Sequence, residues 1–96
     1  MSPKNKKKLE IIRKKVDQID NQLLEIIKKR TLLVNEVVKL KENKSEIVDQ
    51  KRISSILKNI NAKSIKNNID PKITNRIWKN MIWSYINYER RNFKKK

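Results

Sequence analysis

The 96-residue chain contains no glycine, no cysteine and no histidine, and only two prolines. Without cysteine and histidine it can build neither a disulfide framework nor a Cys/His zinc site, and catalysis through a histidine base or triad is excluded. Without glycine it has neither a P-loop nor a Rossmann fingerprint for binding phosphates. Tight β-hairpins also depend on glycine at positive φ, so these absences favour an all-α fold.

Positive charge dominates what the chain does contain. Lysine and arginine number 26 against 10 aspartates and glutamates, which gives a formal net charge of +16. Residues 1–8 hold four lysines and residues 90–96 hold five further positive charges, with no acidic residue in either segment. These segments are typical of a solvated, partly disordered fringe, and the alternative is an arm for nucleic acid or another anionic surface.

The sequence gives no sign of a membrane or export segment. No apolar run approaches the ~20 residues of a membrane span, and no apolar region follows the basic N-terminus as it would in a secretory signal. Together with the lack of cysteine, this favours a cytoplasmic protein without a membrane partner.

The first part of the chain carries a heptad pattern. Neither proline nor glycine interrupts residues 9–42, which predicts one helix of about 34 residues, roughly 51 Å long. A compact domain of this size has a radius of gyration of about 12–13 Å, so the rest of the chain cannot cover such a helix. We therefore expect a homodimer in which long helices meet. The apolar seam comprises Ile12, Val16, Ile19, Leu23, Ile26, Leu33, Val37 and Leu40, and Arg30 is its one charged position.

Two shorter helices are expected after a loop at residues 43–48. Asp49 is suited to cap the first of them, which should end within residues 61–70. Asp70 followed by Pro71 is a start signal for the last helix, because aspartate is a good N-cap and proline fits the first helical position. The predicted architecture is a long, a short and a medium helix.

Three basic residues of the long helix are candidates for binding an anion. Arg30 interrupts the apolar seam, so it needs either an interhelical ion pair or an anionic ligand. Lys41 follows eleven residues later, about 20° around the helix and some 16 Å along it, and therefore shares the face of Arg30. Arg13 lies about 100° off that face, so it could join them only from a partner subunit. Simple solvent exposure is the alternative for Lys41 and Arg13.

The shorter helices add three more candidates. Asp49 and Arg52 are three residues apart and share a helix face, and a cap with a surface ion pair would explain them without a ligand. Glu89 shares the apolar face of the last helix. A helix-end glutamate bonded to Arg90 or Lys63 is the ordinary interpretation, and a role in a binding site is the other.

These charged residues form an ordered series on three helices, namely Arg13, Arg30, Lys41, Asp49-x-x-Arg52 and Glu89. The series resembles the all-helical chorismate mutase family. The segment from Leu9 to Arg30 looks like that family's opening helix, and Asp70-Pro71-Lys72-Ile73 looks like the start of its last helix. The likeness covers residues 9–91, which leaves basic tails at 1–8 and 92–96.

The resemblance implies an activity and an assembly. Members of this family are isomerases that convert chorismate to prephenate by a pericyclic rearrangement, in the shikimate pathway of aromatic amino-acid biosynthesis. They form intertwined homodimers with two shared active sites and use no cofactor and no metal. Such a reaction needs no nucleophile and no general base. It needs a dianion held in a compact conformer and positive charge near the ether oxygen, which arginine and lysine on rigid helices can supply.

The resemblance also implies roles for the substrate-binding residues. Arg30 of one subunit and Arg13 of the other would hold the two carboxylates of chorismate, with Arg52 supporting that charged pocket. Asp49 would lie near the substrate hydroxyl.

The catalytic residues implied by the resemblance are Lys41 and Glu89. Both would donate hydrogen bonds to the ether oxygen of the breaking C–O bond, and Glu89 would do so in its protonated form.

Three positions depart from the usual mutase pattern. Ile53 stands where the mutases carry a glutamate that bonds the ring hydroxyl, Tyr85 stands where they carry serine, and Glu89 is often glutamine. The apolar residue and the tyrosine resemble the isochorismate-pyruvate lyase branch, which forms salicylate and pyruvate, whereas Asp49 favours the mutases. We expect a chorismate mutase, with the lyase as the first alternative. A non-catalytic basic dimer that binds nucleic acid is the second, less favoured alternative.

Overall fold

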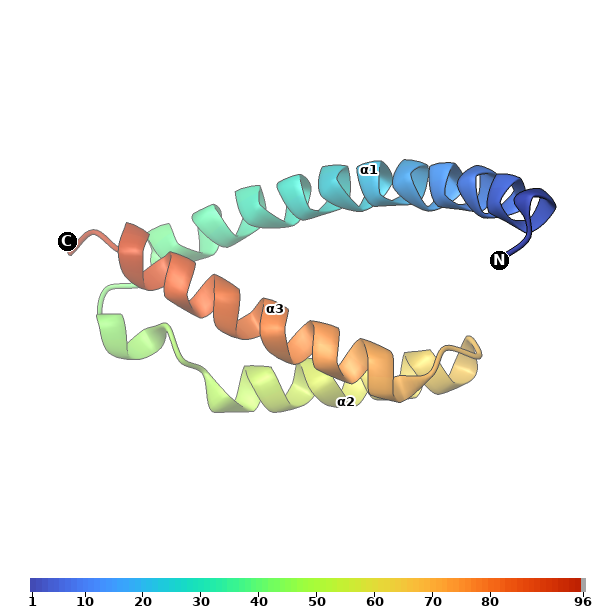
Figure 1. The fold of residues 1–96 in the computed structure, drawn as a ribbon. Coiled ribbons are helices and arrows are strands. Elements are labelled where there is room, and N and C mark those ends of the chain that lie inside the picture. The colour runs from blue at the N-terminus through green and yellow to red at the C-terminus, as the bar shows by residue number, and fades with distance from the viewer. Residues whose placement is uncertain (96) are drawn as a thin grey trace. The chain divides into compact units, whose positions relative to one another are not determined.

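The structure, a computed structural model, describes residues 1–95. Every element in it is helical, as predicted. Helix α1 spans Pro3–Leu40, a short 3₁₀ turn η1 spans Lys44–Glu46, α2 spans Gln50–Lys66 and α3 spans Pro71–Asn92 (Figure 1). With 38, 17 and 22 residues, the three α-helices follow the predicted order of long, short and medium.

Helix α1 begins six residues before the predicted start at Leu9. Ser2 supplies the reason, because its Oγ accepts a hydrogen bond from the backbone N–H of Asn5 at 3.2 Å and its carbonyl accepts from Lys6 at 2.9 Å. Pro3 then occupies a first-turn position that tolerates proline. The lysines of the N-terminal segment are therefore exposed on a helix and not on an irregular fringe.

Both predicted aspartate caps are confirmed. Asp49 Oδ1 accepts a hydrogen bond from the backbone N–H of Arg52 at 3.0 Å at the start of α2. Asp70 Oδ1 accepts from Lys72 at 2.9 Å at the start of α3, with Pro71 in its first turn. The turn between these helices contains Asn68 at a φ of 58°, a left-handed conformation that asparagine tolerates better than most residues other than glycine.

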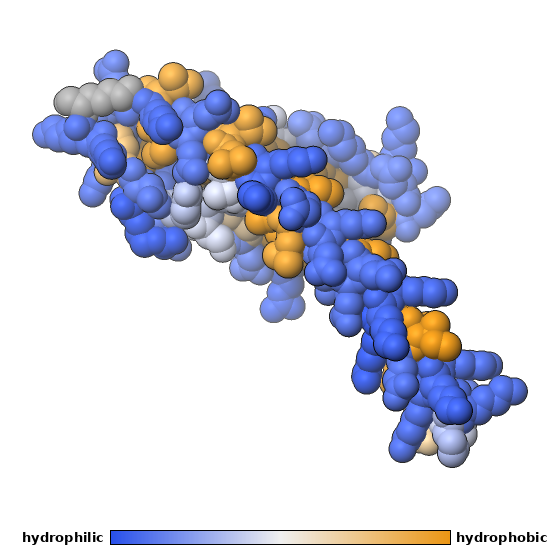
Figure 2. Space-filling model, turned by 90° about the horizontal axis from the view of Figure 1, so that it is seen from above, coloured by the Kyte–Doolittle hydropathy of each residue, from blue (hydrophilic) through white to orange (hydrophobic). Residues whose placement is uncertain are grey.

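The chain divides into two compact units, Met1–Leu33 and the part from Val34 onward. The first unit is the N-terminal part of α1, and none of its residues is buried. The seam side chains Ile12, Val16, Ile19, Leu23 and Ile26 are between 48% and 58% exposed. Hydrophobic side chains also stand in separate groups among hydrophilic ones on the face of the molecule drawn in Figure 2. An isolated chain thus leaves the predicted apolar seam uncovered.

The core lies in the second unit, where α2 and α3 pack against each other (Figure 1). Ile47, Ile82 and Ile86 are buried, and the partly buried residues around them are Val48, Ile53, Ile56, Leu57 and Phe93. At the other end of the pair, buried Ser64 shares a hydrogen bond of 2.6 Å with Thr74, which joins α2 to α3. This core fixes the last turns of α3, which carry the candidate site residues.

A search of the described residues for a membrane span gave a negative result, since none of their helices is both long and apolar enough to cross a bilayer.

Candidate active site

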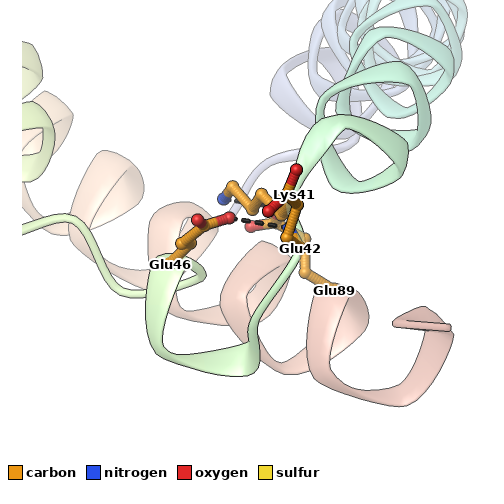
Figure 3. Close-up of polar contacts among 4 residues, drawn as sticks. All are labelled: Lys41, Glu42, Glu46 and Glu89. Carbon is orange, nitrogen blue, oxygen red and sulfur yellow. Dashed lines mark hydrogen bonds and ion pairs between the residues drawn. The ribbon is translucent and has the colours of Figure 1, made fainter. Parts of the chain in front are cut away.

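The structure brings Lys41 and Glu89 into direct contact. Lys41 Nζ donates a hydrogen bond to Glu89 Oε1 at 2.9 Å (Figure 3). Their side chains are 18% and 9% exposed respectively, so most of the ion pair is removed from solvent. Arg90 and Lys63, the partners that the ordinary interpretation of Glu89 suggested, give way to a lysine 48 residues away in the sequence. The two predicted catalytic residues therefore share one small volume.

Glu89 reaches this position because it belongs to the buried face of α3. Ile82, Ile86 and Glu89 are spaced four and three residues apart and are all buried, as residues on one helix face should be. A buried carboxylate without a cation or donor would be expensive. Lys41 supplies that cation. No buried side-chain nitrogen or oxygen in the part of the chain that the structure describes lacks a hydrogen-bond partner.

Lys41 reaches the same place from the end of α1. The helix stops at Leu40, and the backbone N–H of Lys41 bonds the carbonyl of Val38 at 3.3 Å in a tighter turn. Glu46 Oε2 then accepts a hydrogen bond from the backbone N–H of Glu42 at 2.8 Å (Figure 3). Local hydrogen bonds thus fix the backbone conformation on both sides of Lys41.

Two tyrosines lie four residues and one residue before Glu89 on α3. Tyr85, a predicted substrate-binding residue, is partly buried, and its ring packs edge-to-face on Tyr88 with a centroid separation of 6.3 Å and an interplanar angle of 83°. Tyr88 Oη donates a hydrogen bond to Asn35 Oδ1 on α1 at 2.7 Å. Neither Tyr88 nor Asn35 was singled out by the sequence analysis. No local pattern pairs two residues that lie 53 positions apart.

The predicted residues of α2 have different environments. Asp49 and Arg52 are exposed, and the Asp49 carboxylate is engaged as the helix cap. Ile53 is partly buried and packs on the core that contains Ile86. The cap interpretation of Asp49 is confirmed, and Ile53 adds an apolar surface next to the helix face that carries Glu89.

Arg13 and Arg30, the two predicted ligands of the substrate carboxylates, belong to the first unit. Arg13 is exposed and Arg30 is partly buried. The seam residues near them in the sequence, such as Ile12, Val16 and Ile26, are exposed.

Comparison with known proteins identifies the family. The chain matches the family model "Chorismate mutase type II" over residues 12–90, which include all eight predicted site residues. No match was found among curated proteins or among solved structures. The family match covers most of the 96 residues and begins and ends close to the predicted domain limits of 9 and 91. The chain therefore belongs to the chorismate mutase type II family. Membership of this family supports chorismate mutase activity, which is an isomerisation.

Proposed function

We propose that this chorismate mutase rearranges its substrate where Lys41 meets Glu89. The observation that carries the proposal is the 2.9 Å contact between the Lys41 ammonium and the Glu89 carboxyl, most of it shielded from solvent. Both residues stand where the family resemblance expects ligands of the substrate's ether oxygen.

The chemistry of the two groups suits this role. Chorismate rearranges in one concerted step that breaks a C–O bond and forms a C–C bond, and negative charge develops on the ether oxygen as the C–O bond lengthens. An ammonium carries three N–H donors, and Lys41 uses one of them on Glu89. The others are available to the ether oxygen. A donor aimed at developing charge contributes about 10²–10³ in rate.

Glu89 is an acceptor in the ion pair and becomes a donor only when its carboxyl is protonated. In the ionised form it accepts the Lys41 N–H. In the protonated form it can donate to the ether oxygen beside Lys41. The protonated form is thus the one that assists the reaction.

The substrate's two carboxylates require further cations. We assign them to Arg30 and to the partner subunit's Arg13, with Arg52 beside them and Asp49 near the substrate hydroxyl. Family membership and the order of these residues along the chain support the assignment. Guanidinium groups favour it as well, because each can hold a carboxylate through two parallel hydrogen bonds.

A homodimer is part of this proposal, since Arg13 lies off the face of Arg30. The exposed seam supports it. Fully burying an exposed aliphatic side chain contributes about 1.5–3 kcal/mol, so each half-exposed seam residue would contribute roughly half of that on dimerisation. Sedimentation equilibrium should give the mass of two chains. Leu23→Lys in the seam should give one chain, whereas Gln22→Lys, which adds the same charge beside the seam, should leave the dimer intact.

The experiment that tests the function is a substrate assay. Purified protein should remove the ultraviolet absorbance of chorismate and form prephenate. No turnover of chorismate by a folded dimer would refute the proposal. A salt-dependent shift of DNA or RNA without any turnover would favour the non-catalytic basic dimer that binds nucleic acid.

The cytoplasmic location of the protein stays a prediction.

Isochorismate-pyruvate lyase activity is a second candidate, favoured by Ile53. Its side chain packs on the core and cannot bond the ring hydroxyl as the glutamate of the mutases does. Incubation with isochorismate and detection of salicylate fluorescence tests this directly. The substrate with the higher kcat/KM identifies the main activity.

A further inference from the structure

Two separate polar contacts join the end of α1 to α3. Asn35 accepts from Tyr88 at 2.7 Å, and Lys41 donates to Glu89 at 2.9 Å. On α1 the two residues are separated by about 9 Å of helix at the usual rise per residue. On α3 their partners are consecutive. One of the contacts is the candidate catalytic pair, and the other contains no residue assigned to substrate or reaction.

Tyr88 is well fixed on α3. Its ring packs edge-to-face on Tyr85, and its carbonyl accepts a hydrogen bond from Asn92 Nδ2 at 2.8 Å. The hydroxyl therefore presents a donor at a defined place. The 2.7 Å distance to Asn35 Oδ1 is the most common one for a bond from a hydroxyl to an oxygen acceptor.

The Lys41 side chain is less well fixed than the backbone around it. It is the first residue after α1, and its side chain is a long, flexible stem with a point charge at the end. The place of its ammonium therefore depends on how the last turns of α1 are set on α3. Between Asn35 and Lys41 the chain buries Val38, but an aliphatic contact restricts rotation about the helix axis less than a directional hydrogen bond does.

We propose that the hydrogen bond between Tyr88 and Asn35 is a positioning device for the reaction, which sets the end of α1 on α3 so that the Lys41 ammonium lies at Glu89. Neither residue touches the substrate in this proposal. Both act through Lys41, and the inference rests on the proposed role of Lys41 and Glu89.

Tyr88→Phe tests the inference, because it removes the hydroxyl and keeps the ring that packs on Tyr85. We expect kcat to fall about three- to tenfold, the effect of one lost hydrogen bond, with KM changed less than twofold because the carboxylate ligands stay in place. Asn35→Asp, which keeps an acceptor oxygen for Tyr88, should retain kcat, whereas Asn35→Leu should match Tyr88→Phe. Thr74→Val is the matched control, since it removes a hydroxyl hydrogen bond of α3 at the other end of the helix. It should lower stability without lowering kcat.

A Lys41→Met background separates positioning from a general loss of structure. If Tyr88 acts through Lys41, adding Tyr88→Phe to Lys41→Met should cause no further loss of kcat. An undiminished additional loss, or a kcat of Tyr88→Phe equal to that of wild type, overturns the positioning role while leaving the role of Lys41 intact. Full activity in Lys41→Met alone overturns the proposed function itself and this inference with it.

Discussion

Lys41→Met is the substitution that tests most directly what the buried ion pair does. Methionine keeps most of the length and apolar character of the lysine stem and removes the ammonium. The Glu89 residue, 7% exposed, would then lack its cation. Breaking a fully buried pair on one side costs about 3–5 kcal/mol, and because water reaches part of the Lys41 side chain, 18% exposed, we expect about 1–3 kcal/mol. For a chain of this size that lowers Tm by roughly 5–20 °C.

The double variant Lys41→Met, Glu89→Gln separates stability from catalysis. Glutamine removes the unpaired charge, so the free energy of unfolding should return to within about 1 kcal/mol of wild type. The rate should stay about 10²–10³-fold below wild type, because the ammonium that stabilises the ether oxygen is still missing. Thermal unfolding followed by circular dichroism at one fixed protein concentration gives Tm, and loss of chorismate absorbance gives kcat.

Two results would refute this reasoning. If the double variant regains the rate together with the stability, Lys41 serves only as the counterion of Glu89. If Lys41→Met unfolds at the wild-type temperature, the ion pair contributes nothing to stability and the desolvation argument is wrong.

Three further predictions concern Glu89, Arg30 and the core. Glu89→Gln, whose amide keeps a hydrogen-bond donor at this place, should retain turnover of chorismate; loss of turnover in a folded variant would contradict the donor role. Arg30→Ala should lower kcat/KM at least about 100-fold while sedimentation still gives a dimer, whereas simple unfolding would favour a structural ion pair. Ile86→Ala, at a buried position, should destabilise the protein by about 2–5 kcal/mol, seen as a lower urea midpoint with an unchanged m value.

Local signals predicted the helices and most of their limits. The caps Asp49 and Asp70 are encoded by short patterns, and the hydrogen bonds that they make depend only on residues two or three positions away. The start of α1 was predicted too late, because Ser2 and Pro3 are also a local signal but stand among lysines that were interpreted as a fringe. Asn68 shows how the chain makes a turn without glycine, which the composition alone does not reveal.

The site was less accessible to sequence reasoning. The apolar helix face that carries Glu89 explained why this carboxylate would need a cation. Its ordinary partners were Arg90 and Lys63, and only the family resemblance singled out Lys41. The pairing of Lys41 with Glu89 depends on the packing of the end of α1 on α3. Local sequence patterns do not encode that packing. The contact between Asn35 and Tyr88 had no signal in the sequence, and the grouping of Arg13 with Arg30 stays a prediction.

The pairing of α2 with α3 has a consequence for how the chain folds. The core cluster and its surrounding residues all lie between residues 47 and 93, and the two helices are joined by the short turn at residues 67–70. Helices joined by a short turn pair early and quickly, because little chain entropy is lost in closing a short loop. A helical hairpin can therefore fold within one chain before its long first helix finds a partner. In the proposed dimer, refolding then has a fast phase that is independent of protein concentration, followed by a second-order phase that completes the seam.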